Sequence, residues 1–314
     1  IKKLKNKSSL IFISHRLEEI LEITDRIYVM KNGEVVESMN TKEATTDKLH
    51  SLMVGKELQK EYYKEELQNN LKKEVVLEIK NLSLNNVFKN INFSLHKGEV
   101  LGFAGVIGSG IDQLSRVLYG FSKPTTGEIF IDGQLIELNS PKDAVKNGIG
   151  YLPKDRRSEG LIQFMSLSNN LTLTNLNNIK KYGILSRKKE IDLTNEWINK
   201  LSIKANNVDI ICNYLSGGNQ QKVVLAKWMH AGVSIMIMDH PTRGIDVGAK
   251  REVYGVIRDL TNRGISIIIV SDTIEETIGL SNTIIVLKDG ELKQIVKSNK
   301  GNKPLPIEII KYMV

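Results

Sequence analysis

The chain has 314 residues, of which 41% are apolar, and 44 basic against 36 acidic residues give a net charge of +8. This length allows one large domain or two smaller ones, and no apolar run approaches the roughly 20 residues that span a bilayer. The one cysteine, Cys212, excludes a disulfide framework and is typical of a reducing compartment. The lysines are scattered, which favours an ordinary solvated surface over a nucleic-acid or membrane surface.

The chain contains an internal repeat. Residues 9–34 align without gaps with residues 266–291, an offset of 257. In each copy an apolar strand leads into an acidic helix and then into a hairpin with Asn-Gly or Asp-Gly at its turn. The repeat therefore predicts the C-terminal remnant of one domain (residues 1–58) before a complete second copy (residues 74–314). The chain begins with Ile1, which we interpret as the mark of a fragment.

The stretch between the two copies differs from both in composition. Residues 59–73 are charged and poor in glycine and proline, as expected of a linker. From residue 74 to residue 131, alternating apolar and polar residues predict strands. Between about residues 140 and 228 the pattern turns helical, which predicts an inserted helical subdomain.

Residues 105–112, GVIGSGID, follow an apolar strand and have the spacing of a phosphate-binding loop that opens a helix. We call them the glycine loop. Ile111 stands where a lysine should hold the β- and γ-phosphates, and Asp112 stands where a hydroxyl should bind Mg²⁺. The backbone cradle permits weak nucleotide binding, but we do not expect this loop to support hydrolysis. Its candidate binding residues are Gly105, Gly108, Ser109 and Gly110.

Residues 215–222, LSGGNQQK, are a second candidate site, which we call the signature segment. A serine hydroxyl, bare backbone N–H groups and the positive end of a helix meet there, which suits phosphate oxygens. An apolar strand then ends in Asp239, and an acid at the C-terminal edge of a buried strand is the layout of an α/β nucleotide-binding protein. The candidate ligands of the signature segment are Ser216, Gly217, Gly218, Asn219 and Gln220.

The signature segment and the run PTRGIDVGAK (residues 241–250) resemble ABC transporter ATPases, most closely the tandem-domain ATPases of monosaccharide importers. MVGKEL (residues 53–58) and PKDRRSEGL (residues 153–161) extend the resemblance over nearly the whole chain. It implies an α/β fold of the ABC-type P-loop NTPases. That fold has a mixed sheet with helices and an inserted helical subdomain, here preceded by the tail of a second such domain.

The resemblance also implies roles for single residues. Asp239 would hold Mg²⁺ weakly through water, and His240 stands where the family has the glutamate that polarises the attacking water. The histidine that contacts the γ-phosphate corresponds to His15 in the first repeat but to Asp272 in the second. Because ABC domains dock head to tail, the signature segment would cap ATP in trans. The phosphate loop would come from a missing first domain or a second copy, and the glycine loop would be a degenerate site.

The function implied is that of the ATP-binding, energy-coupling subunit of a bacterial monosaccharide importer. It would lie peripherally on the cytoplasmic face of the membrane and use ATP and Mg²⁺. Its partners would be two membrane-spanning permease subunits and an extracytoplasmic sugar-binding protein, with no nucleic acid, and this chain alone would hydrolyse ATP weakly or not at all. Three alternatives stay open: a purine-nucleoside importer ATPase, a soluble ABC protein acting on ribosomes or nucleic acid, and a decayed gene product.

Overall fold

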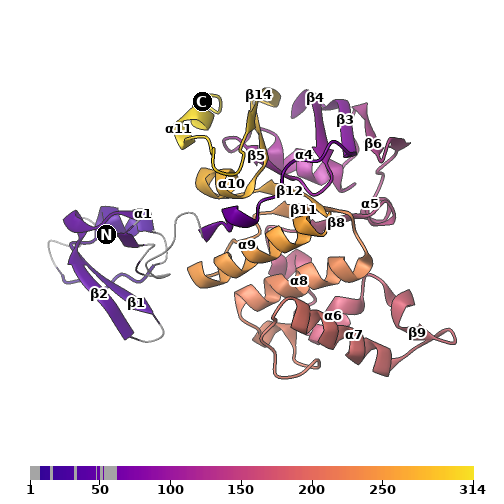
Figure 1. Cartoon of the computed structure of the whole chain (residues 1–314), viewed down its shortest axis with the longest axis horizontal. Coiled ribbons are helices and arrows are strands. Elements are labelled where there is room, and N and C mark those ends of the chain that lie inside the picture. Colours follow the sequence, from indigo (N-terminus) through magenta and orange to yellow (C-terminus); the bar gives the residue numbers. More distant parts are fainter. Residues whose placement is uncertain (1–7, 15–16, 32–33, 47, 50–51, 53–61) are drawn as a thin grey trace.

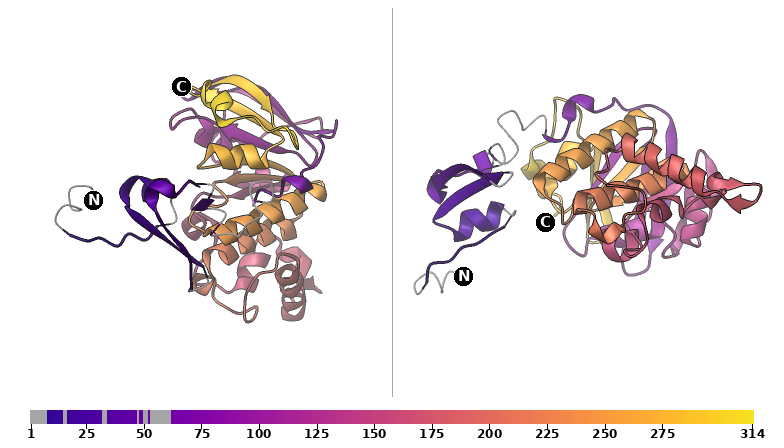
Figure 2. Two further views of the ribbon diagram at one scale, coloured as in Figure 1. Left: turned by 60° about the vertical axis from the view of Figure 1, so that its left-hand side comes forward. Right: turned by 90° about the horizontal axis from the view of Figure 1, so that it is seen from below.

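The computed structural model describes residues 8–314 apart from residues 15–16, 32–33, 47, 50–51 and 53–61. Among the described residues, those before residue 53 form a small hydrophobic core of their own. The residues from 62 onward form a much larger body, and Figures 1 and 2 show the two parts.

The elements bounded within the described residues of the small part are α1 (Leu17–Ile23), β1 (Arg26–Lys31), β2 (Glu34–Asn40) and the short η1 (Thr41–Glu43). Their buried apolar residues pack together: Leu17, Ile27, Val29, Met39 and Leu49.

The repeat seen in the sequence is present in these elements. The bounds of α1, β1 and β2 recur 257 residues later in α10 (Ile274–Leu280), β13 (Thr283–Lys288) and β14 (Glu291–Lys297). Even the register shift in the hairpin recurs, after Val29 in one copy and after Val286 in the other. The same local sequence pattern has therefore produced the same local structure twice.

The strand predicted at the start of the first copy is wrong. Residues 9–13 belong to no strand, and Ile11 and Ile13 are exposed. Their counterpart β12 (Ser266–Val270) is held between β11 (Ile235–Asp239) and β5 (Val100–Ala104). No described strand flanks residues 9–13 in this way, and a parallel strand gets its hydrogen bonds only from its neighbours.

A six-stranded sheet forms the centre of the large part, in the order β14-β13-β5-β12-β11-β8, with β8 at Ile149–Leu152. Its pairs are parallel except for β13 with β14. β5, β8, β11 and β12 are buried along their whole length, as continuous apolar runs predict for strands covered on both faces. The carboxyl ends of these four parallel strands therefore meet at one edge, where ligands of α/β proteins bind.

A second, antiparallel sheet lies beside the first, in the order β4-β3-β6-β7 (Figure 1). Its strands are β3 (Val75–Leu84), β4 (Phe88–His96), β6 (Thr126–Ile131) and β7 (Gln134–Ile136). The hairpin between β6 and β7 turns at Asp132 and Gly133, which both have positive φ, as a two-residue hairpin turn requires. Leu77, Ile79 and Leu95 face the main core.

Helices surround the central sheet and continue away from it. α4 (Ile111–Leu118), α5 (Pro141–Lys146), α9 (Val247–Asn262) and α11 (Pro306–Ile310) belong to the sheet region. α8 (Gly217–Ala231) lies between the sheet and an outlying group with α6 (Leu167–Thr172) and α7 (Arg187–Lys200), as Figure 1 shows. The outlying group also contains the short elements η4 (Leu176–Ile179), β9 (Lys180–Lys181), β10 (Ile184–Leu185) and η5 (Cys212–Tyr214).

The expected helical insertion at about residues 140–228 starts too early. β8 lies inside that range but pairs with β11 in the central sheet. Its four-residue run IGYL is too short to show a period, so the surrounding helical pattern concealed it. The helical part begins only after this strand, at the turn η3 (Arg156–Gly160).

Part of the expected linker is firmly packed. Tyr62 and Tyr63 lie against each other and against Tyr254 of α9, with ring centroids 5.0 to 5.3 Å apart. Beyond η2 (Glu65–Leu67), Gln68 is buried and donates to the carbonyl oxygen of Ser298 at 2.8 Å. The residues from 62 onward therefore belong structurally to the large part rather than to a free linker.

Candidate nucleotide-binding site

The glycine loop connects β5 to α4, as its spacing predicts. Gly108 and Gly110 have φ of +88° and +94°, and Gly110 is the residue before the first turn of α4. Positive φ is readily adopted only by glycine, so both positions depend on it. The loop borders a pocket of about 490 Å³, which is also lined by Lys154, His240 and Asp272.

Ile111 and Asp112 remove the usual chemistry from this loop. The Ile111 side chain is buried in the main core, so it places no charge in the pocket. Asp112 is exposed in the first turn of α4, where its carboxylate complements the positive helix end that would otherwise attract a phosphate. The loop keeps the backbone shape of a phosphate cradle, but its side chains contribute negative charge.

The acids Asp239 and Asp272 at the ends of the strands both contact the ring of His240. The Tyr151 hydroxyl donates to Oδ2 of Asp239 at 2.8 Å, and Nδ1 of His240 lies 2.5 Å from Oδ1 of the same carboxylate. Nε2 of His240 lies 3.3 Å from Oδ1 of Asp272. His240 has a φ of +52°, uncommon for a residue with a Cβ, and its ring bridges the two carboxylates.

This arrangement leaves neither ring nitrogen of His240 free to act as a base. Both ring nitrogens of His240 face a carboxylate, so neither is available to take a proton from water. The family resemblance places glutamate at position 240 and histidine at position 272. The chain therefore retains an acid and an imidazole in contact but with their two positions exchanged.

Mg²⁺ does not fit at Asp239 in this arrangement. Burial raises the pKa of Asp239, but hydrogen bonds from His240 and Tyr151 and the nearby charge of Lys154 outweigh it, and the pKa lies below its ordinary value. Both oxygens of this ionised carboxylate already accept hydrogen bonds. Within the described ranges, no group of three or more His, Cys, Asp or Glu residues is placed to hold a metal ion. The Mg²⁺ role expected for Asp239 is thus not supported by its surroundings.

The signature segment begins α8, as expected. Ser216 is the exposed residue before the first turn, and its Oγ accepts from the Asn219 amide at 2.9 Å rather than from the backbone. The first backbone hydrogen bond within the helix runs from Gln220 to the carbonyl of Ser216. The N–H groups of Gly217, Gly218 and Asn219 therefore have no acceptor within the helix and are available to an anion.

Gln220 does not point toward this helix end. Its side chain is 1% exposed, and its amide nitrogen donates to the carbonyl oxygen of Cys212 at 3.0 Å. The expectation that Gln220 binds nucleotide does not agree with this inward orientation. Asn219 accepts from the backbone N–H of Lys204 at 2.9 Å, so its side chain braces the turn. Ser216, Gly217, Gly218 and the backbone N–H of Asn219 remain the candidate ligands.

The two candidate sites are separate within this chain. None of residues 216–220 lines the pocket at the glycine loop. His15, the residue expected to contact the γ-phosphate, lies outside the described residues, as does the segment 53–58. The structure thus brings together the glycine loop, Asp239, His240 and Asp272. The signature segment lies outside the pocket that they border.

Sequence reasoning did not single out Lys154 and Arg156, which the structure places beside the two candidate sites. Lys154 is half-buried and lines the pocket at the glycine loop. Arg156 is buried and contacts the start of α8 (see below). The only available signal was the resemblance of PKDRRSEGL to a family segment, which also fits a plain charged loop.

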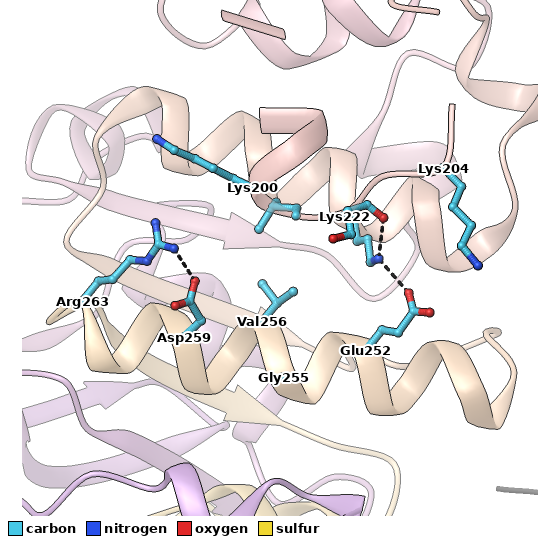
Figure 3. A pocket seen from close by; sticks show the side chains of 10 residues that line it. Lys200, Lys204, Lys222, Glu252, Gly255, Val256, Asp259 and Arg263 are labelled. Atoms are coloured by element: carbon cyan, nitrogen blue, oxygen red, sulfur yellow. Dashed lines mark hydrogen bonds and ion pairs between the residues drawn. The ribbon is translucent and has the colours of Figure 1, made fainter. Parts of the chain in front are cut away.

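A second hollow, of about 580 Å³, lies between the end of α7, α8 and α9 (Figure 3). Its charged residues are largely paired with one another. Lys222 lies 2.7 Å from Glu252, and Arg263 lies 2.7 Å from Asp259. Lys200 and Lys204 leave the lining with two more basic than acidic residues, and none of the candidate ligand residues named above lines this hollow.

Comparisons with known proteins agree with this geometry. A family model described as ABC transporter matches residues 88–243. The ribose import ATP-binding protein RbsA of Clostridium tetani is 41% identical over 319 residues, which cover 100% of this chain and 61% of that protein. The protein of the same name in Bacillus subtilis is 40% identical over 299 residues, covering 95% and 60%. The chain thus spans about three fifths of the length of these relatives.

Solved structures agree in fold. A nucleotide-free ATP-binding cassette from an ABC transporter superposes with a TM-score of 0.64 at 19% identity, covering 76% of this chain and 95% of that one. The protein cbiO1 from Clostridium perfringens, part of the transporter complex cbiONQ, gives 0.62 at 23% identity, covering 76% and 92%. The fold is therefore that of an ATP-binding cassette, a P-loop NTPase domain with a mixed sheet. Within the described residues, no helix is both long and apolar enough to cross a membrane. Residues 88–243 of the chain form a domain of the ABC transporter family, and the chain is similar over its length to ATP-binding proteins of that family.

Proposed function

We propose that this chain is the ATP-binding, energy-coupling part of a monosaccharide importer, with ribose as the first sugar to test. Relatives at 40 to 41% identity are named ribose import ATP-binding proteins. The observation that carries the proposal is a contrast between two sites. The signature segment presents an open helix end, whereas the acids near the glycine loop are both held by the ring of His240.

In this proposal ATP binds between the signature segment and the phosphate loop of another domain. Ser216 offers an exposed hydroxyl, and the N–H groups at the start of α8 offer donors toward the terminal phosphate. Donors fixed in this way stabilise negative charge in the transition state without having to reorganise. His15 stays a predicted contact of the same phosphate. Closure of the two domains on ATP would drive transport, and hydrolysis would reset them.

The glycine loop of this chain has a structural role in the same proposal. Ile111 supplies no cation, His240 has no free nitrogen, and Mg²⁺ does not fit at Asp239. The loop still holds β5 and α4 in the shape of the fold. The competent site would therefore be the single one that the signature segment completes.

The remaining partners follow from the kind of transporter. Two membrane-spanning permease subunits and an extracytoplasmic sugar-binding protein would complete the importer. The ATPase would lie on the cytoplasmic face of the membrane. Because the sugar passes through the permease, the ATPase residues described above do not choose it.

Calorimetric titration of this chain with Mg-ATP tests whether the glycine loop is a degenerate nucleotide site. We expect no binding, or affinity in the millimolar range, because the loop lacks its cation. Micromolar binding would show that the backbone cradle suffices and that the degenerate-site proposal is wrong. The variant Ile111→Lys, titrated in the same way, restores the missing lysine and should bind ATP more tightly than the unmodified chain.

Uptake measurements test the substrate class. A strain that lacks the gene should lose import of ribose or a related monosaccharide and regain it when the intact gene is supplied. Loss of purine-nucleoside import with unchanged sugar import would instead support a nucleoside importer.

A further inference from the structure

Arg156, at the start of η3, is buried, and in the described part of the chain it forms no ion pair with a carboxylate. It is 7% exposed, and its Nη1 and Nη2 donate to the carbonyl oxygens of Arg243 and Gly244 at 2.7 and 3.2 Å. Its Nε is buried and has no hydrogen-bond acceptor among the described residues. Burial, together with the charge of Arg157, lowers the pKa of Arg156. A buried guanidinium is costly unless its surroundings use it, so this position calls for an explanation beyond packing.

The guanidinium lies against the first residue of α8. A Cβ on Gly217 would come within 2.6 Å of Nη2 of Arg156 and within 3.2 Å of the Gly244 carbonyl oxygen. A Cβ on Gly218 would come within 2.7 Å of the Cβ of Ala249. Both glycines of the signature segment are therefore required by contacts within this chain, in addition to any ligand they approach.

The turn η3 contacts α8 at its far end too. Nζ of Lys227 donates to the carbonyl oxygen of Gly160 at 2.6 Å, and a Cβ on Gly160 would come within 3.2 Å of Val224. One end of η3 thus contacts the start of α8, and the other end contacts Val224 and Lys227, about two to three turns further along the helix. The turn and the helix are held together as a unit, with Arg156 at the nucleotide-facing end.

The position of the charge matters as much as the contact. The N-terminus of a helix carries a partial positive charge, and Arg156 adds a full one directly beside it. Two like charges in contact disfavour the empty state of this helix end. An anion bound at the N–H groups of Gly217 and Gly218 relieves that repulsion, so the arrangement favours phosphate.

We propose that Arg156 is a positioning residue for the nucleotide that α8 caps in trans. It fixes the glycine turn against the segment 243–246 and strengthens the positive potential at the helix end. This inference rests on the function proposed above, because it presumes a phosphate at the signature segment. It adds a residue that touches no nucleotide and acts through Gly217 and Gly244.

The test compares Arg156→Met, Arg156→Lys and Arg157→Met in the complete protein within its assembled transporter. Arg157 is the matched control because it is the next arginine in the same turn and is exposed. ATPase rates over a range of ATP concentrations give kcat and KM, and thermal melts give the folded fraction. We expect kcat/KM of Arg156→Met to fall on the order of tenfold to a hundredfold. Arg156→Lys keeps the charge but not the forked donor, so it should fall between this variant and the unmodified protein.

The following outcomes decide between the proposal and its alternatives. Equal kcat/KM in Arg156→Met and Arg157→Met overturns the proposal, as does a loss that the folded fraction fully explains. If Arg156→Met does not fold, a folded Arg156→Lys decides in the same way. Absence of ATPase activity in the unmodified transporter refutes the proposed function, and with it this inference. Full activity with no effect at Arg156 refutes the inference alone.

Discussion

Replacing Arg258 by methionine should destabilise the large part by about 3 kcal/mol. Arg258 of α9 is 1% exposed and donates to the carbonyl oxygens of Leu280 and Gly279, each at 2.7 Å, and of Tyr63 at 3.2 Å. Burial lowers the pKa of Arg258 to about 10, so the group stays charged at neutral pH. Three hydrogen bonds from a charged donor, at about 1.5 kcal/mol each, outweigh the roughly 1.5 kcal/mol that a buried methionine returns.

Urea unfolding followed by circular dichroism measures this difference. A loss of about 3 kcal/mol would lower the urea midpoint by roughly 1 M for a domain of this size. Arg263→Met is the matched control, since Arg263 lies in the turn just after α9 and its pair with Asp259 is about half exposed. That pair should be worth about 0.5 kcal/mol. A shift for Arg258→Met no larger than that for Arg263→Met would refute the reasoning that the three carbonyls depend on this guanidinium.

Three further predictions test other contacts, two of them with a matched control substitution. Gly279→Ala should lower the free energy of unfolding by about 2 kcal/mol, because the new Cβ would come within 2.3 Å of the Tyr63 ring. The control Gly255→Ala in α9 meets no atom within 4 Å and should raise it by about 0.5 kcal/mol. Equal melting temperatures of the two variants would contradict this prediction. Burial lowers the pKa of Lys227 to about 8 from 10.5, so the unfolded chain binds more protons between these values and the free energy of unfolding should rise with pH from about 8 to 10.5. In Lys227→Met the rise of the unfolding free energy with pH should be smaller. Urea unfolding at several pH values measures it, and the same pH dependence in the variant and the unmodified protein would disprove the assignment to Lys227. Tyr151→Phe should lose about 1 kcal/mol with its hydrogen bond to Asp239, while Tyr182→Phe, at an exposed tyrosine, should be neutral; thermal melts of both variants decide.

The sequence was sufficient wherever structure depends on local pattern. Continuous apolar runs predicted β11 and β12 as buried strands, and glycines at fixed spacing predicted the loop before α4. The same sequence pattern predicted the hairpin in both copies of the repeat, and the hairpin forms in both with bounds that correspond residue by residue.

Contacts between distant residues could not be predicted in this way. Arg156 meets Gly244 across 88 residues of sequence, and Arg258 meets Tyr63 across 195. No periodicity or spacing encodes such pairs. The inward turn of Gln220 and the bridging ring of His240 depend on neighbours of the same kind. Residues 9–13 show the converse, since a sequence suited to a strand forms none without strands beside it.

The exchanged acid and imidazole at positions 240 and 272 also constrain how this protein can change over generations. His240→Glu alone would gather three carboxylates at positions 239, 240 and 272, and Asp272→His alone would set two imidazoles against each other. Each single step is unfavourable because like groups in contact disfavour one another's charged forms. The two positions should therefore mutate as a pair, and lineages with histidine at the first should carry an acid at the second. Reaching the glutamate-histidine order that the family resemblance implies would therefore need both changes together.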